Sequence, residues 1–177
     1  SEDEEAKKTL DELLKKAEEL VKKIKETSER LLRKSDKLLE ETKKTIKELD
    51  DEVKEVKKRN VSEEDLKRLA EKLREILKRL EDRHRKLVEE WEKVTRELAK
   101  ELEDLRREVK RILDELRKRG VSEEVLRRIE EIIRRVTELL KKVLKEDREV
   151  VEEARKKNEE VLDRLKKIIE EAEERLR

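Results

Sequence analysis

The sequence predicts an all-α protein, an antiparallel up-down-up bundle of three long helices. The composition is the first reason: of 177 residues, 59% are Asp, Glu, Lys or Arg and 32% are hydrophobic, with no proline and one glycine. Such a composition is typical of long helices and coiled coils. The second reason is that apolar residues recur at helical spacing along the chain. The third is that helix-stop and helix-start signals occur together at only two places.

These two breaks divide the chain into helices that we expect at about 2–59, 62–119 and 122–177, with turns at 60–61 and 120–121. With a rise of ~1.5 Å per residue, a helix of ~57 residues would be ~85 Å long. Connections this short force neighbouring helices to run antiparallel. We therefore expect a single domain, one bundle that spans residues 1–177.

The same capping chemistry is used at both breaks. Asn60 and Gly120 are residue types that accept the left-handed conformation at the end of a helix. Ser62 and Ser122 are N-caps, because a serine hydroxyl can accept a hydrogen bond from a free amide of the next turn. These four residues are the predicted helix caps.

The spacing of the apolar residues predicts nearly straight helices. In the second helix the apolar stripe advances in steps of three and four residues, and a doubled step of four returns once every five turns. Five turns of a relaxed helix take about 18 residues, at ~3.6 residues per turn, so little supercoiling is expected. Adjacent apolar pairs widen each stripe, so each helix contacts two others. We expect no second stripe on the outer faces and hence a monomer; the alternative is a hairpin whose third helix is held by a partner chain.

Polar residues interrupt the apolar stripes in two layers. Folding the chain at its turns places His84 beside Ser35 and Asn158, and a second layer around Asp147. We interpret the layers as buried hydrogen-bond networks that penalise a wrong register, since slippage would leave polar groups unpaired. Thr42 and Thr45 form a weaker third feature. The predicted network residues are Ser35, His84 and Asn158 in the first layer and Thr27, Ser28, Trp91, Thr95 and Asp147 in the second.

Two expectations about stability follow from these layers. If His84 is buried and neutral, its pKa falls below the unfolded value of ~6.5 and it favours folding only above that pH. Replacing Asp147 by alanine should destabilise the fold by about 1–3 kcal/mol, because hydroxyl donors would lose their acceptor.

Several function classes are excluded by composition. Without cysteine there is no thiolate metal site or cysteine nucleophile, and a single histidine cannot supply the two Glu-x-x-His pairs of a di-iron bundle. A net charge of +1 argues against nucleic-acid binding, and no apolar run is long enough to span a membrane. The lone glycine lies in a turn, so no phosphate-binding loop is expected. We therefore expect no enzyme activity, cofactor, metal or small-molecule substrate.

The repeated Val-Ser-Glu-Glu turn, the 18-residue period, the surface saturated with Glu, Lys and Arg, and the layered polar residues resemble computationally designed, parametrically generated helical bundles with hydrogen-bond networks. The resemblance implies a de novo designed structural protein or rigid scaffold with no natural activity or location, soluble and cytoplasmic when expressed recombinantly. The alternative is a designed interaction module or switch that binds a partner helix or self-associates through its bundle core.

Overall fold

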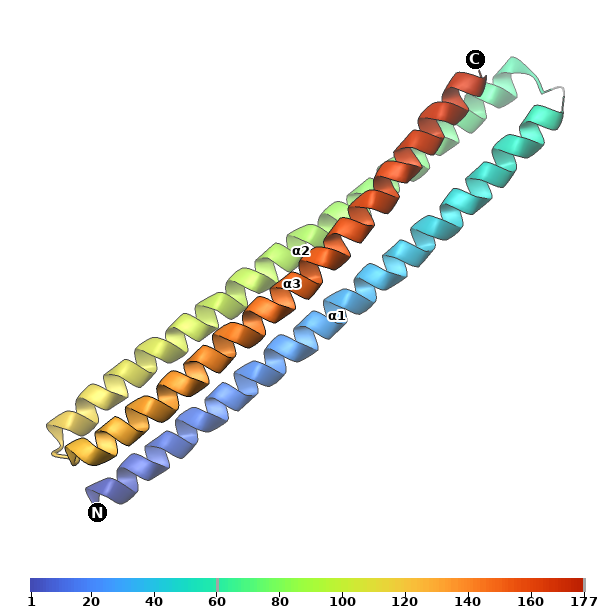
Figure 1. Ribbon diagram of the computed structural model, residues 1–177. Helices are drawn as coiled ribbons and strands as arrows, with labels where there is room; N and C mark the ends of the chain where they lie inside the picture. Colours follow the sequence, from blue (N-terminus) through green and yellow to red (C-terminus); the bar gives the residue numbers. More distant parts are fainter. Residues whose placement is uncertain (60, 177) are drawn as a thin grey trace. The chain divides into compact units, whose positions relative to one another are not determined.

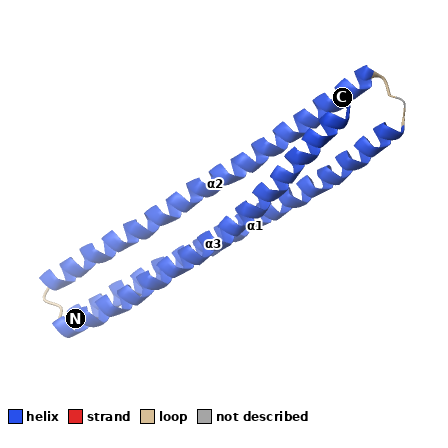
Figure 2. Cartoon of the chain, turned by 45° about the horizontal axis from the view of Figure 1, so that its top comes forward, coloured by secondary structure: helices blue, strands red, loops and turns tan. Residues whose placement is uncertain are grey.

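The computed structural model describes residues 1–59 and 61–176 and confirms the three-helix fold class. Within these residues the helices are α1 (Glu2–Lys58), α2 (Glu63–Lys118) and α3 (Glu123–Leu176), traced in chain order in Figure 1. Short loops join them, and no strand occurs in this part of the chain (Figure 2). The observed ends lie within about one residue of the predicted ones.

The chain divides into two compact units. The first unit contains Ser1–Glu29 and Glu92–Val150, and the second contains Arg30–Trp91 and Val151–Arg177. Each unit therefore holds a segment of α1, a segment of α2 and a segment of α3. A single domain spanning residues 1–177 stays a prediction.

The turn between α2 and α3 shows why the helices end where they do. Gly120 has φ of 81°, the left-handed conformation that costs glycine nothing. The amide of Gly120 donates to the Arg117 carbonyl at 3.3 Å, and that of Val121 to the Leu116 carbonyl at 3.2 Å. This pair of hydrogen bonds is the Schellman motif, which satisfies carbonyls that the helix leaves free.

Both predicted serine caps lie just before their helices. The Ser62 hydroxyl accepts from the Asp65 amide and the Ser122 hydroxyl accepts from the Val125 amide, each at 3.3 Å. The positive end of each following helix carries acidic residues in its first turn, which adds a favourable dipole interaction. Asn60, the fourth predicted cap, lies outside the described residues.

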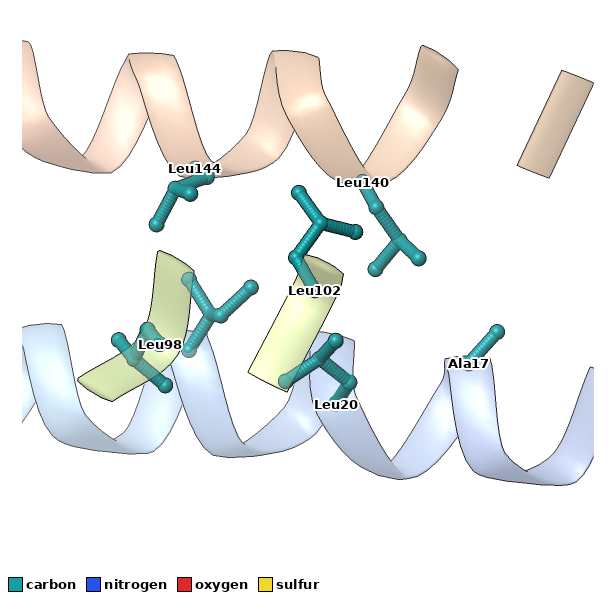
Figure 3. Close-up of a cluster of buried hydrophobic side chains, with 7 residues drawn as sticks. Ala17, Leu20, Leu98, Leu102, Leu140 and Leu144 are labelled. Carbon is teal, nitrogen blue, oxygen red and sulfur yellow. The ribbon is translucent and has the colours of Figure 1, made fainter. Parts of the chain in front are cut away.

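The core of each unit repeats with the predicted period. On α1, Ala6, Ile24 and Thr42 occupy the same position in successive repeats and are all 0% exposed. In the first unit one apolar cluster brings leucines of the three helices together with Ala17 and Ile24 (Figure 3). Its members are Ala17, Leu20, Ile24, Leu98, Leu102, Leu140 and Leu144.

Candidate functional site: a buried polar layer

The second unit contains a layer of four buried polar side chains. In the sequence, each of them lies one full repeat from a member of the apolar cluster in Figure 3, namely Ala17, Ile24, Leu102 or Leu140. The corresponding residues are Ser35, Thr42, His84 and Asn158, which are between 0% and 6% exposed. The layer is therefore a polar version of an apolar core cluster that the same chain also contains.

Thr42 and His84 form the first half of this polar layer. The Thr42 hydroxyl donates to the Leu38 carbonyl at 2.8 Å, and its Oγ1 lies 3.3 Å from His84 Nε2. Because the hydroxyl has only one proton, it accepts from the imidazole, and the geometry assigns the tautomer with the proton on Nε2. The bond joins α1 to α2 within the second unit.

Asn158 and Ser35 form the second half and join α3 to α1. The Asn158 amide Nδ2 donates to the Ser35 hydroxyl and to the Ala154 carbonyl, the latter at 2.8 Å. The Asn158 Oδ1 atom is buried and has no hydrogen-bond partner. An unpaired buried carbonyl costs free energy, so this half of the layer is only partly satisfied.

The predicted pairing of His84 was wrong in one respect, because the imidazole bonds to Thr42 and not to Ser35. Helical side chains tilt toward the N-terminus of their own helix. On antiparallel helices the tilts of His84 and Thr42 bring the two side chains together, whereas Ser35 tilts away from His84. Thr42 was predicted only as part of a weaker feature, although it follows Ile24 by one full repeat and so occupies a core position.

The environment of His84 disfavours its charged form. Burial, and secondarily the neighbouring Arg83 guanidinium, lowers the pKa of the imidazole below its ordinary value of 6.5. Arg83 itself is ion-paired with Glu41 of α1 at 2.5 Å, so the positive charge next to the layer is held in place. His84 is therefore neutral at pH 7.

The second predicted layer is less buried than the first. Thr27, Ser28, Thr95 and Asp147 are all half-buried members of the first unit. The Ser28 hydroxyl lies near enough to the Asp147 carboxyl to favour its charged form, and Asp147 Oδ2 is buried without a hydrogen-bond partner. Trp91 is buried but belongs to the second unit, so its bond to Asp147 stays a prediction.

The environment of Asp147 disfavours the charged form of its carboxyl. Burial raises the pKa of its carboxyl above the ordinary value of 3.8. The Ser28 hydrogen bond and the positive charge of Lys25 oppose this shift, while the negative charge of Glu146 reinforces it. The carboxylate is thus a charged group at a position where the repeat elsewhere places buried Ile129 and Leu165.

Outside these layers, the described residues form a groove on the first unit but no cluster of metal ligands. Among them no group of three or more His, Cys, Asp or Glu side chains could hold a metal ion. A groove of about 370 Å³ lies on the first unit beside the ion pairs Lys16–Glu108 and Lys23–Glu101, whose charges neutralise one another. No helix in the described part of the chain is long and apolar enough to cross a membrane.

Comparison with known proteins gave a distant structural likeness. No protein-family model and no curated protein matches the chain. Among solved structures, the chain is similar to a "Computationally designed three helix bundle" at 20% sequence identity, with a TM-score of 0.43, over 98% of this chain and 85% of that chain. This likeness is too distant to carry an inference about function.

Proposed function

We propose that the protein is a de novo designed structural scaffold with no natural biochemical activity. The observation that carries this proposal is the regularity of the ion pairs between α1 and α2. Their α1 members recur at alternating short and long steps of two and three helical turns, and each step forward on α1 is matched by an equal step back on α2. The regular pairs are Glu5–Arg119, Lys16–Glu108 and Lys23–Glu101 in the first unit and Lys34–Glu90, Glu41–Arg83 and Glu52–Lys72 in the second. Arg30, one turn before Lys34, adds a longer contact of 4.0 Å to the same Glu90.

One short step and one long step together make up one full repeat, the same repeat that orders the core. A parametrically generated backbone repeats its surface with the same period as its core. The charged side chains then align neighbouring helices with one another rather than bind a ligand. Each exposed pair adds less than about 1 kcal/mol. Their shared contribution is to favour one register, since slippage would place like charges opposite each other.

The polar layer of the second unit supports the same purpose. Its four side chains replace residues that the first unit fills with Ala, Ile and Leu. They bond to one another across helices and to backbone carbonyls of their own helices. Buried polar groups of this kind penalise wrong helix pairings, because any other pairing strands a donor or an acceptor. A scaffold needs this specificity, whereas a catalytic site would need a group that faces a substrate.

Guanidinium denaturation followed by circular dichroism in the far ultraviolet tests the proposal. A scaffold should be hyperstable, with a midpoint above ~5 M guanidinium chloride. The midpoint should not change after dialysis against a chelator or after addition of Zn²⁺, because no ligand contributes to folding. A midpoint that rises on addition of a metal, or helicity that appears only with a ligand, would contradict the proposal.

A further inference from the structure

Three large apolar side chains of α3 are exposed on the first unit. Ile132 is 38% exposed, Leu139 56% and Val150 48%. They are separated by two and then three helical turns, which places them on one side of the helix. The prediction that no apolar stripe remains on an outer face was therefore wrong for these residues, which we call the α3 stripe.

The α3 stripe lies on the side of α3 that faces away from α2. A groove of about 320 Å³ runs between α2 and α3 on the first unit, and Lys141 is among the residues of α3 that line it. Leu139 precedes Lys141 by two residues, or ~200° around the helix, so the two side chains lie on opposite sides of α3. Lys25 of α1 acts on the charge of Asp147, so α1 lies along this other side. The α3 stripe therefore borders the interface between α1 and α3.

Ion pairs between helices are distributed unevenly over the three interfaces. α1 and α2 are joined by the six regular pairs and by the contact of Arg30 with Glu90. α2 and α3 are joined by Arg117–Glu130 in the first unit and by Arg74–Glu173 and Glu81–Lys166 in the second. Among the described residues no ion pair joins α1 to α3, although the charge of Lys25 acts on Asp147 across this interface. The α1–α3 interface therefore lacks the direct charge pairing that the other two have.

The polar side chains of the α1–α3 interface are incompletely satisfied. In the second unit Asn158 bonds to the Ser35 hydroxyl, but its Oδ1 is buried without a hydrogen-bond partner. In the first unit Oδ2 of Asp147 is buried in the same way. Two other buried side-chain atoms without a hydrogen bond, Glu41 Oε2 and Arg155 Nε, belong to groups that are ion-paired. Because water can bond to an unpaired oxygen once it is exposed, opening the α1–α3 interface recovers hydration that burial removed.

We propose that the bundle opens at the α1–α3 interface, so that within a unit α3 separates locally from α1 while both helices stay in contact with α2. The ion pairs of α1 with α2 oppose separation of those two helices, although each adds less than about 1 kcal/mol. The α3 stripe is already in contact with water, so opening exposes less new apolar surface at this edge. Local opening of this kind requires less free energy than unfolding of the whole chain.

Single cysteines on α1 test this opening in the second unit, because the chain has no cysteine of its own. S35C places a thiol against Asn158 of α3, and T42C, two turns further along α1, places one against His84 of α2. Ser35 is 1% exposed and Thr42 0%, so either thiol reacts with dithionitrobenzoic acid only after its interface opens. Both substitutions are nearly isosteric, and each removes one hydrogen bond between helices.

The rate of each variant is measured in buffer and divided by its rate in the chain unfolded by guanidinium chloride, which corrects for the intrinsic reactivity of the thiol. By this ratio S35C should react at least ~10-fold faster than T42C, while both keep the circular dichroism spectrum of the wild-type chain. Equal ratios would show that the chain opens only by global unfolding. Equal ratios, or a faster T42C, would overturn the proposal.

A charge reversal on α2 tests the contribution of the ion pairs. R83E places a carboxylate opposite Glu41 of α1, so it should accelerate labelling of T42C about 5-fold and change that of S35C less than ~2-fold. R85E is the matched control, because Arg85 is ion-paired within α2 in the described part of the chain, and it should leave both rates unchanged. If R83E accelerated S35C as much as T42C, or if R85E had the same effect as R83E, the ion pairs would not hold α1 on α2 and the proposal would be wrong.

Discussion

His84 and Asp147 are polar side chains at core positions of the repeat, and their ionisation is shifted in opposite senses. Burial lowers the pKa of the imidazole and raises that of the carboxyl. In both cases the folded state favours the neutral form. The two residues therefore contribute to stability with opposite dependence on pH.

The stability of the protein should fall as the pH drops below ~6.5 because of His84. Since its folded pKa lies below the unfolded value, the unfolded chain binds the proton first, and the loss continues until the folded pKa is reached. H84L should remove this part of the pH dependence, measured as the free energy of unfolding in urea between pH 7 and pH 5. The Thr42 hydroxyl keeps its bond to Leu38, so the variant leaves no donor stranded. An unchanged pH profile in H84L would show that the imidazole is solvated.

Replacing Asp147 by leucine should stabilise the first unit by about 1 kcal/mol at pH 7, since a partly buried apolar side chain replaces a partly desolvated charge. One oxygen of the wild-type carboxylate is buried without a hydrogen-bond partner, so its loss strands no bond. The expectation that alanine at this position destabilises the fold stays a prediction. The wild-type chain gains stability as the pH falls through the raised pKa toward 3.8, so the advantage of D147L should shrink in that window. Urea titrations at pH 7 and pH 4 measure this, and a loss of stability at pH 7 would contradict it.

At the scale of single elements, the helix ends depend on a few backbone hydrogen bonds. The Schellman motif at Gly120 and the Ser122 cap together define the turn between α2 and α3. Val121 between them is buried beside Leu126 in an apolar cluster. The turn is therefore tied both to its helices and to the core of the first unit.

Gly120 should tolerate asparagine better than alanine. G120A should destabilise the protein by about 1–2 kcal/mol, because a Cβ atom penalises the left-handed conformation that the φ of 81° requires. G120N should cost less, since asparagine adopts this conformation more readily. Thermal denaturation of the two variants measures the difference, and equal losses would show that the backbone conformation does not limit the turn.

At the scale of the whole molecule, the polar layer and the apolar cluster occupy equivalent positions of the repeat. The residue types of one can therefore be substituted at the positions of the other. The quadruple variant S35A/T42I/H84L/N158L gives the second unit the residue types of the cluster in Figure 3. The opposite exchange, A17S/I24T/L102H/L140N, gives the first unit the polar layer. The two variants separate the energetic cost of the layer from its place in the chain.

The apolar exchange in the second unit should raise the free energy of unfolding by about 2–4 kcal/mol, because it removes an unpaired buried carbonyl and adds apolar surface to the core. The polar exchange in the first unit should lower it by at least as much. Guanidinium titrations at pH 7 measure both. A loss of stability in the apolar variant would show that the layer's hydrogen bonds stabilise the fold rather than specify it.

The register between helices shows where prediction from sequence stops. The turns place residue 37 level with His84, and both Ser35 and Thr42 are core positions nearby. The choice between them depends on the direction of the side chains, which numbering along the axis does not contain. The exposure of Leu139 is a similar case, since the rotation of α3 about its axis decides whether Leu139 or its neighbour Leu140 faces the core.

The sequence by itself determined the three helices, their ends to within about one residue, the period of the repeat and the set of core positions. These features are local or periodic, so propensity, capping and spacing suffice to predict them. Only the tertiary structure decided that His84 bonds to Thr42, that one oxygen each of Asn158 and Asp147 is unpaired, and that three apolar residues of α3 stay exposed. Each depends on how side chains of different helices meet, and this is set by rotation and tilt rather than by spacing along one helix.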